Sequence, residues 1–337
     1  MKRILVTGAT GFIGSHTLVE LIDRGYSVIG IDNLANSSLD VLNRIKDITG
    51  IRPEFREGDI RDKEFLNHIF QMFEVDSVIH FAGYKAVDES VREPMLYYSN
   101  NLIATQLLLE AMQKNGIKKL IFSSSCTVYG DSKYVPITEE SETCPVNPYG
   151  RTKYYIENML RDLSCSDSHW KILNLRYFNP VGAHPTGLIG EDPLGIPNNL
   201  FPFLTQTAIG KRDAMLVFGS DYDTPDGTCI RDYIHVVDLA KGHLAALEAL
   251  DNIQGINFIN LGTGNGSSVL EIVNTFKKVN DVEFIVEMAP RRKGDAAKVW
   301  ADTTKAKKVL KWKSELTLED MLRDAWNWQQ KNPNGYI

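Results

Sequence analysis

Short apolar runs alternate with longer segments of helical periodicity in the first half of this chain. The runs predict strands at 3–7, 27–31, 54–57, 77–80, 120–123 and 172–176. Between most of them, apolar residues recur at helical spacing, as in 12–24, 63–73 and 98–115. Strands that alternate with helices indicate βαβ units. The pattern therefore predicts an α/β fold, a doubly wound parallel sheet with helices on both faces.

The pattern changes after about residue 178. Proline and glycine concentrate between residues 180 and 202, and short predicted strands at 216–218 and 256–261 mix with helices at 237–250 and 269–278. We therefore predict two domains. Residues 1–178 form the parallel-sheet domain, and residues 179–337 form mainly a smaller α/β domain. The boundary is soft, and segments such as 231–262 can return to the first domain.

Charge and cysteine content exclude several classes of partner. The 37 basic and 43 acidic residues give a net charge of −6, which makes the chain a poor ligand for nucleic acid or an anionic membrane. Its apolar runs are too short to span a bilayer, and the N-terminal run is too short for a signal peptide. The four cysteines lie far apart and the seven histidines lack metal-ligand spacing. We expect a cytoplasmic protein with reduced thiols and no metal site.

The segment Thr7-Gly8-Ala-Thr-Gly11-Phe-Ile-Gly14 follows the first predicted strand and opens a helix. Glycines at such a junction let the backbone approach a pyrophosphate, which then lies at the positive end of the helix. Glycines also cap ordinary strand–helix turns, but here the next strand ends in Asp32. A carboxylate at that place accepts from an adenosine ribose 2′-hydroxyl and repels a 2′-phosphate. The context predicts a dinucleotide site for NAD rather than NADP.

The motif Tyr149-Gly-Arg-Thr-Lys153 is the candidate for acid–base chemistry. It follows Pro-Val-Asn-Pro, a helix-start signal, so Tyr149 and Lys153 are predicted to share a helix face. The ammonium, with a positively charged nicotinamide, then lowers the pKa of the phenol and makes it a base near neutral pH. A second match, Tyr129-Gly-Asp-Ser-Lys133, contains residues typical of a turn. We therefore favour Tyr149.

Two further polar segments each allow a structural and a functional interpretation. The strand at 120–123 runs into Ser123-Ser124-Ser125-Cys126-Thr127, where a hydroxyl can bond a substrate oxygen or merely satisfy backbone groups. The segment Asn260-Leu-Gly262-Thr-Gly264-Asn-Gly266 lies between a predicted strand and a predicted helix. A structural turn is favoured there over a second phosphate loop.

Together these residues resemble a known family, the extended short-chain dehydrogenase/reductases, and within it the UDP-glucose 4-epimerases. The segments shared with the wider family are Val-Thr-Gly-Ala-Thr-Gly-Phe-Ile-Gly-Ser-His at 6–16, Ile-Asp-Asn-Leu at 31–34, Val-Ile-His-Phe-Ala-Gly at 78–83, Phe-Ser-Ser-Ser at 122–125 and Tyr149 to Lys153. More specific to the epimerases are Arg-Tyr-Phe-Asn-Pro-Val-Gly-Ala-His-Pro at 176–185, Gly-Glu-Asp-Pro at 190–193, Ile-Pro-Asn-Asn-Leu at 196–200, Arg-Asp-Tyr-Ile-His-Val at 231–236 and Ala-Pro-Arg-Arg-Lys-Gly-Asp at 289–295. The resemblance runs nearly end to end.

The resemblance implies a Rossmann domain that holds NAD and a smaller domain that grips UDP. The implied NAD contacts are Gly8, Gly11, Phe12, Ile13, Gly14, Asp32, Asn33, Asn36, Ser37, Asp59, Ile60, Phe81, Ala82, Gly83, Lys85, Asn100, Ser125, Tyr149, Lys153 and Phe178. The implied UDP-sugar contacts are Lys85, Ser125, Tyr149, Phe178, Asn179, Asn199, Leu200, Leu216, Phe218, Arg231, Arg292, Asp295 and Val299. Family members are usually homodimers, and the resemblance implies pairing through the helices predicted at 98–115 and 149–163.

The implied reaction is the reversible epimerisation at C4 of UDP-glucose and UDP-galactose. Tyr149 takes the proton of the 4-hydroxyl while the C4 hydride passes to NAD, Ser125 steadies the same oxygen, and Lys153 binds the nicotinamide ribose. The 4-keto sugar, anchored by its UDP, then turns and takes the hydride back on its other face. Val299 stands where epimerases strict for non-acetylated hexoses carry a bulky aromatic residue. This extends the hypothesis to UDP-N-acetylhexosamines.

Other functions stay open alongside this one. A nucleotide-sugar 4,6-dehydratase or decarboxylase shares Tyr149 and Lys153, but needs acidic residues just after the Ser/Thr, where Cys126 and Thr127 stand. Another NAD-dependent nucleotide-sugar epimerase is a further alternative. A non-catalytic NAD-binding interaction protein is expected to lose Tyr149 or Lys153, and both are present.

Besides Val299, Asp88 departs from the family, which usually has glycine at that position.

Overall fold

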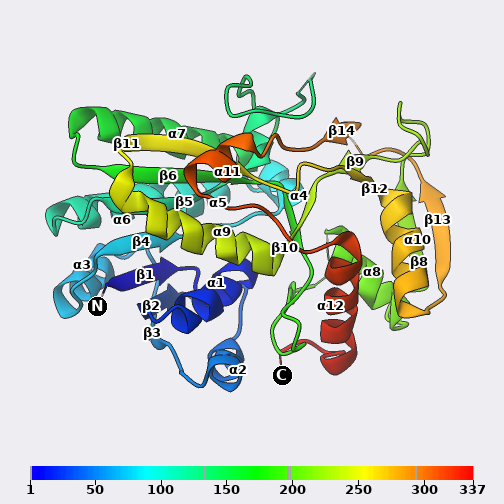
Figure 1. Ribbon diagram of the computed structural model, residues 1–337, viewed down its shortest axis with the longest axis horizontal. Helices are drawn as coiled ribbons and strands as arrows, with labels where there is room; N and C mark the ends of the chain where they lie inside the picture. Colours follow the sequence, from blue (N-terminus) through cyan, green and yellow to red (C-terminus); the bar gives the residue numbers. More distant parts are fainter. Residues whose placement is uncertain (1, 133, 196, 198, 293, 337) are drawn as a thin grey trace.

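The computed structural model describes residues 2–132, 134–195, 197, 199–292 and 294–336. Its main sheet has seven parallel strands in the order β11-β6-β5-β4-β1-β2-β3. The strands are β1 (Arg3–Thr7), β2 (Ser27–Asp32), β3 (Glu54–Glu57), β4 (Ser77–His80), β5 (Lys119–Ser125), β6 (Lys171–Tyr177) and β11 (Gly255–Leu261). The strand order reverses beside β1, as in a doubly wound Rossmann sheet. The predicted α/β fold class is confirmed (Figure 1).

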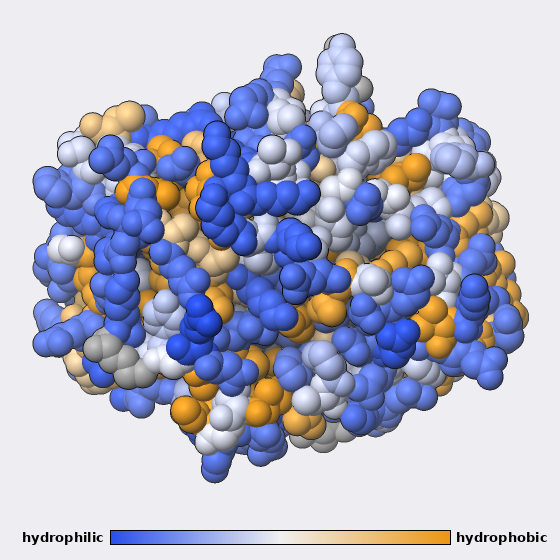
Figure 2. All heavy atoms as spheres, viewed as in Figure 1, coloured by the Kyte–Doolittle hydropathy of each residue, from blue (hydrophilic) through white to orange (hydrophobic). Residues whose placement is uncertain are grey.

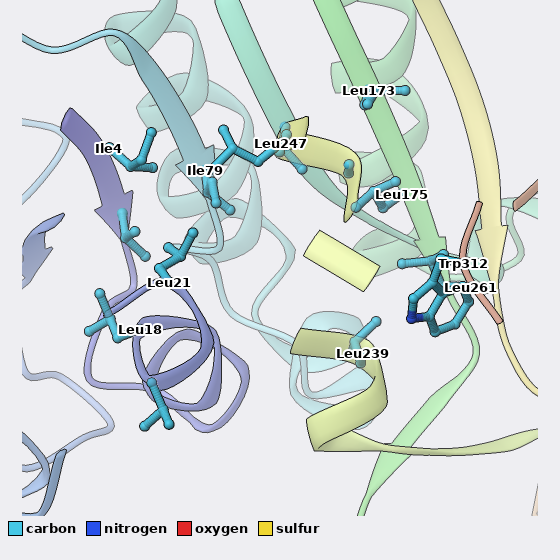
Figure 3. Close-up of a cluster of buried hydrophobic side chains, with 14 of the residues drawn as sticks. Ile4, Leu18, Leu21, Ile79, Leu173, Leu175, Leu239, Leu247, Leu261 and Trp312 are labelled. Atoms are coloured by element: carbon cyan, nitrogen blue, oxygen red, sulfur yellow. The ribbon is translucent and has the colours of Figure 1, made fainter. Parts of the chain in front are cut away.

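Helices cover both faces of this sheet because successive side chains of a strand point to opposite sides. One face carries α1 (Phe12–Asp23), α2 (Asp40–Thr49) and α9 (Val236–Ala249), and the other carries α3 (Lys63–Met72), α6 (Ala104–Lys114) and α7 (Pro148–Ser166). Ile4 of β1 is buried in the core of the first face, and its neighbour Leu5 in the core of the second. Figure 3 shows the first core, where Leu18 and Leu239 approach the sheet from α1 and α9.

The second half of the chain builds a smaller region beside the sheet (Figure 1). Its strands are β7 (Asn179–Val181), β8 (Ala214–Phe218), β9 (Ile230–Arg231), β10 (Tyr233–His235), β12 (Ser267–Ser268), β13 (Ile285–Ala289) and β14 (Lys298–Val299). Its helices are α8 (Leu200–Ala208), α10 (Val269–Asn280) and α12 (Leu318–Lys331). Phe201, Val217, Phe276 and Leu322 from these elements share one buried core. The chain returns to the main sheet at β11, which pairs with β6.

The helix predicted at 98–115 is more irregular than its pattern suggests. Two short helices, α4 (Val87–Arg92) and α5 (Pro94–Tyr97), lead into a π-helix, η1 (Tyr98–Ile103), before α6 begins. The π-helix holds the buried Asn101, whose side chain accepts from the backbone N–H of Tyr84 at 2.8 Å and donates to its carbonyl at 2.9 Å. Such turns are frequent at functional sites, and this one fixes the loop after β4.

Three short helices complete the chain: η2 (Cys126–Tyr129), η3 (Leu250–Asn252) and α11 (Thr304–Val309). Hydrophilic residues cover most of the face in Figure 2, with hydrophobic residues in small groups. Among the described helices, none combines the length and apolar character that crossing a membrane requires. All four cysteines are free thiols, as the sequence predicts.

Candidate active site

A cavity of about 1170 Å³ lies at the carboxyl ends of the central strands. In doubly wound sheets this edge is where ligands bind. Of the residues that the sequence assigned to cofactor or substrate, all but Val299 line it. Val299 lies on β14, in register with Arg231 of β9, and packs against the buried cluster that contains Phe178. The structure thus brings together residues that are far apart in the chain.

The glycine turn after β1 leaves room for a ligand at one end of the cavity. Gly8 has φ +67°, and a Cβ there would lie 2.7 Å from the backbone nitrogen of Ala82. A Cβ on Gly14 would collide with the carbonyl oxygen of Gly8. Gly11 is the N-cap of α1, no side chain of the described residues caps this helix, and its first turn has no acidic residue. The positive end of α1 therefore faces the cavity and fits an anionic group such as a diphosphate.

Two carboxylates flank this turn. Asp32, at the end of β2, accepts from the backbone N–H groups of Thr10 at 3.2 Å and Leu34 at 2.9 Å and from the Ser37 hydroxyl at 3.3 Å. Asp59 accepts from Asn33 Nδ2 at 2.9 Å and forms an ion pair with Arg61, which holds the pKa of its carboxyl well below the usual range. Both side chains are fixed by protein partners, Asp32 at the place predicted for the adenosine ribose and Asp59 at another predicted NAD contact.

Helix α7 places the tyrosine and the lysine of the motif on one side. The helix begins at Pro148, and the Asn147 side chain caps it by accepting from the N–H of Gly150 at 2.8 Å. Lys153 is buried, and its ammonium donates to the carbonyl oxygen of Ser123 at 2.6 Å. Burial lowers the pKa of Lys153 to about 8, although Glu157 one turn away raises it. The cation is thus fixed at the end of β5.

Burial of the phenol of Tyr149 raises its pKa to about 12. The lowered pKa predicted from the sequence includes the charge of a bound nicotinamide and stays a prediction. Among the described residues that shift this pKa, only Ser125 acts in the lowering direction. The Ser125 Oγ itself accepts from the Thr127 hydroxyl at 3.0 Å and from its backbone N–H at 3.2 Å. The spacing of the motif indicates which residues neighbour the phenol, but it does not show that desolvation is the largest influence on the pKa of the phenol.

The two rival motifs have structural roles. Tyr129 is buried in η2, away from the cavity lining, where its hydroxyl donates to Asn260 Oδ1 at 2.6 Å. Its motif partner, Lys133, lies outside the described residues. In the second glycine loop, the N–H groups of Thr263 and Gly264 donate to the buried carboxylate of Asp232 at 2.8 Å and 3.0 Å. A carboxylate of the chain itself occupies the concavity that a phosphate would fill, so the turn interpretation is confirmed.

The other end of the cavity carries two arginines. Arg231 lies 3.8 Å from the Asp295 carboxylate, and the guanidinium of Arg292 lies 3.9 Å from the ring centroid of Phe218. Glu191 is not among the predicted site residues, although the surrounding Gly-Glu-Asp-Pro segment carries part of the family resemblance. Glu191 accepts from Lys85 Nζ at 2.6 Å and from Asn199 Nδ2 at 2.8 Å, and so joins the loop after β4 to the segment before α8.

The dehydratase alternative lacks its acids in the structure as well. Cys126 and Thr127 line the cavity directly after Ser125. Burial raises the pKa of the Cys126 thiol to about 12, so this group is a very weak acid. Neither side chain can protonate a leaving hydroxyl near neutral pH.

Comparison with known proteins agrees with the residues found in the cavity. A family model described as GDP-mannose 4,6 dehydratase matches residues 5–325. The UDP-glucose 4-epimerase of Dictyostelium discoideum is 56% identical over 335 residues, covering 99% of this chain and 97% of the relative. A crystal structure of the UDP-glucose 4-epimerase of Bifidobacterium longum in complex with NAD⁺ and UDP is 51% identical, with a TM-score of 0.96 over 99% of this chain and 100% of that one.

A second solved structure broadens the comparison. The UDP-Glc/GlcNAc 4-epimerase of Campylobacter jejuni is 37% identical, with a TM-score of 0.86 over 98% of this chain and 100% of that one. The identities over nearly full length agree with the fold and with the residues gathered in the cavity. The chain belongs to the UDP-glucose 4-epimerase family.

Proposed function

We propose that this protein interconverts UDP-glucose and UDP-galactose by epimerisation at C4, with NAD as a bound cofactor. The observation that carries the proposal is the meeting of Ser125, Tyr149 and Lys153 on the wall of one cavity, between the glycine turn and two arginines. Near-full-length relatives that are UDP-glucose 4-epimerases support the same reaction.

The residues at the glycine turn fit NAD. The uncapped N-terminus of α1 would hold the pyrophosphate, and Asp32 the adenosine ribose. Lys153 would hold the nicotinamide ribose. The chemistry that bound NAD would supply is the reversible acceptance of a hydride from the sugar C4. We assign residues 1–178 mainly to this cofactor and residues 179–337 mainly to the UDP-sugar, apart from β11 in the main sheet.

The proton of the reaction is moved by Tyr149. As a phenolate it accepts the proton of the 4-hydroxyl, and it returns this proton after the ketone has turned. The Ser125 hydroxyl stabilises the phenolate and holds the same sugar oxygen. Because burial raises the pKa of the phenol, the phenolate needs nearby positive charge, which the nicotinamide ring would add once NAD is bound, with the Lys153 ammonium holding its ribose.

The nucleotide end of the substrate is held more firmly than the hexose. Arg231 and Arg292 would bind the diphosphate, because a guanidinium donates two parallel hydrogen bonds to phosphate oxygens. Binding energy at this end leaves the reacting sugar free to turn between its two faces. Val299 is a small residue behind this region, and the Campylobacter jejuni relative is a UDP-Glc/GlcNAc 4-epimerase. Both favour acceptance of UDP-N-acetylhexosamines.

We also propose a homodimer in a reducing cytoplasm. Met95 on α5, Ile103 on η1 and Tyr155 on α7 are exposed at 75%, 49% and 44%. Apolar side chains in such a group favour burial against a second copy. Sedimentation of the protein and of Ile103→Arg tests this: a wild-type monomer at micromolar concentration contradicts it. The free thiols are typical of a reducing compartment.

The central experiment incubates the purified protein with UDP-galactose and no added cofactor, and resolves the products by chromatography. We expect UDP-glucose to form. In a parallel incubation with UDP-N-acetylgalactosamine, we expect UDP-N-acetylglucosamine to form. Tyr149→Phe serves as the inactive control. If no UDP-glucose forms even with NAD supplied, the proposed hexose reaction is wrong. If only the N-acetylated product is absent, the broad specificity alone is wrong.

A further inference from the structure

A buried polar cluster lies directly behind the acid–base residues. Glu157 is one helical turn after Lys153 on α7, and its side chain is 2% exposed. Its carboxylate accepts from Arg176 Nε at 2.9 Å, from Arg176 Nη2 at 2.7 Å and from the Ser124 hydroxyl at 2.6 Å. The site described above does not use these three side chains. A fully buried charge pair is a costly arrangement for stability alone, so its place in the fold calls for an explanation.

The cluster reaches the site through the end of β5. In the parallel pairing of β5 with β6, Ser124 lies beside Arg176, which explains why both side chains reach the same helix. Ser124 stands between Ser123, whose carbonyl accepts from the Lys153 ammonium, and Ser125, which lines the same cavity as Tyr149 and lowers the pKa of its phenol. Tying Ser124 to Glu157 therefore fixes the backbone that presents both neighbours.

The far side of the cluster is rigid as well. Arg176 Nη1 donates to the Tyr129 hydroxyl at 2.9 Å, and its guanidinium lies 4.8 Å from the ring centroid of Phe258 on β11. Tyr129 in turn donates to Asn260, also on β11. Glu157 is thus held directly by groups of β5 and β6, and its partner Arg176 is held in turn by groups of η2 and β11.

We propose that Glu157 is a positioning residue for the reaction: through Ser124 and Arg176 it holds the end of β5 so that Ser123 meets Lys153 and Ser125 meets Tyr149. This inference rests on the proposed function for its kinetic test. It has two separable consequences. Through Ser124, Glu157 affects the Ser125 hydrogen bond to the phenolate. Through its charge, it keeps Lys153 protonated, since a carboxylate one turn away favours the ammonium.

Other titratable groups lie near Tyr149 and Lys153 and contribute to their pKa values. The groups that act on Tyr149 or Lys153 directly are His80 on β4, Tyr97 on α5, Cys126 on η2 and Tyr177 on β6. One contact further away lie Glu89 on α4, Tyr129 on η2, Glu139 in the loop before α7 and Arg176 on β6. Burial lowers the pKa of His80 to about 3, so it stays neutral. Glu157→Gln leaves the Arg176 charge without its partner, and this extra positive charge also repels the Lys153 ammonium.

The test compares holoenzyme variants by the pH dependence of kcat with UDP-galactose. For Ser124→Ala we expect the rising limb of the profile to move to higher pH and kcat at neutral pH to fall by roughly tenfold, with KM changed far less. The double variant Ser124→Ala/Ser125→Ala should lose no more than Ser125→Ala alone, because both act through one hydroxyl. For Glu157→Gln we expect the falling limb to move to lower pH as Lys153 loses its proton earlier.

Asp238→Asn is the matched control for stability. Asp238 is buried on α9, accepts from the N–H groups of Glu315 and Leu316 at 2.8 Å, and lies outside the cavity lining. The Asp238→Asn variant should have a lower melting temperature, but neither limb of its pH profile of kcat should move. The Ser124 and Glu157 variants can instead lose activity equally at every pH, with neither limb of the profile moved. Their role is then only structural, and the proposal is overturned. If Glu157→Gln does not fold, Ser124→Ala and its double variant decide.

A second measurement keeps this inference separate from the assigned substrate. Tyrosinate absorbance is titrated for the wild type and Ser124→Ala, each against its Tyr149→Phe counterpart, with no sugar present. We expect the phenol of Ser124→Ala to ionise at higher pH. An unchanged midpoint contradicts the positioning role whatever the substrate is. Absence of wild-type epimerase activity contradicts the proposed function and leaves this titration valid.

Discussion

Replacing Ser125 with alanine tests the electrostatics of the acid–base centre most directly. Burial raises the pKa of Tyr149 to about 12, and the Ser125 hydrogen bond opposes this rise. A hydrogen bond to a charged group contributes about 1.5–3 kcal/mol. That free energy corresponds to a shift of about one to two pKa units. Without the hydroxyl, the phenolate loses this donor, so the pKa of Tyr149 rises further in Ser125→Ala.

The expected pH profile follows from the sign of this shift. The base works only when deprotonated, so kcat rises as pH passes the pKa of Tyr149 in the enzyme–substrate complex. In Ser125→Ala the rise is displaced to higher pH. At a pH below both values, kcat falls about 10- to 100-fold. Well above both values, most of this loss disappears, because Tyr149 is ionised in both proteins.

The assay follows UDP-glucose formation from UDP-galactose over the pH range in which the protein stays folded. Tyr149→Phe controls for the base itself and should remove the rising limb with the activity. Ser132→Ala controls for the substitution, since the Ser132 hydroxyl lies on an exposed loop outside the cavity lining and donates to the Tyr134 carbonyl. An equal loss of kcat at every pH would refute the reasoning. Ser125 would then hold the sugar oxygen without tuning the phenol.

Three further predictions concern the two ends of the cavity. Gly8→Ala places a Cβ 2.7 Å from the Ala82 nitrogen at a positive φ, so NAD affinity and melting temperature should both fall. Wild-type NAD binding in a calorimetric titration would contradict this. Asp32→Asn removes the charge that repels a 2′-phosphate, so the ratio of NADP to NAD affinity should rise; an unchanged ratio speaks against this ribose site. Glu191→Ala removes the partner of Lys85 and Asn199, so KM for UDP-galactose should rise several-fold while kcat stays nearly unchanged. Steady-state kinetics in which only kcat falls would disprove this role of Glu191.

The arrangement of the cavity could be predicted from the sequence because a simple rule connects strands to sites. Gly8, Asp32 and Ser125 are separated by long stretches of chain, but each lies at or just after the carboxyl end of a predicted strand. In a parallel sheet these ends meet at one edge. Once the strands were identified, the meeting of these residues needed no knowledge of side-chain packing. The fold class was predicted from a separate pattern, the alternation of strands and helices, and the sheet confirms it.

The energetics of the site could not be predicted in that way. Spacing puts Lys153 beside Tyr149, but the pKa of the phenol depends on how completely both are buried, which is a property of the packed structure. The role of Glu157 was also missed. Its partners come from the register of β5 on β6, which aligns Ser124 with Arg176, and periodicity does not reveal register between strands.

The two glycine loops show why a motif needs its surroundings to be interpreted. Both follow a strand of the main sheet and precede a helix. In the loop at 262–266 the N–H groups of Thr263 and Gly264 already bond Asp232, and the helix beyond begins with a capping box of Ser268 and Glu271. In the loop at 8–14 the helix has no such cap among the described residues. An anion binds where backbone donors have no partner in the chain, so the deciding residue for the second loop is Asp232, about thirty positions earlier in the sequence.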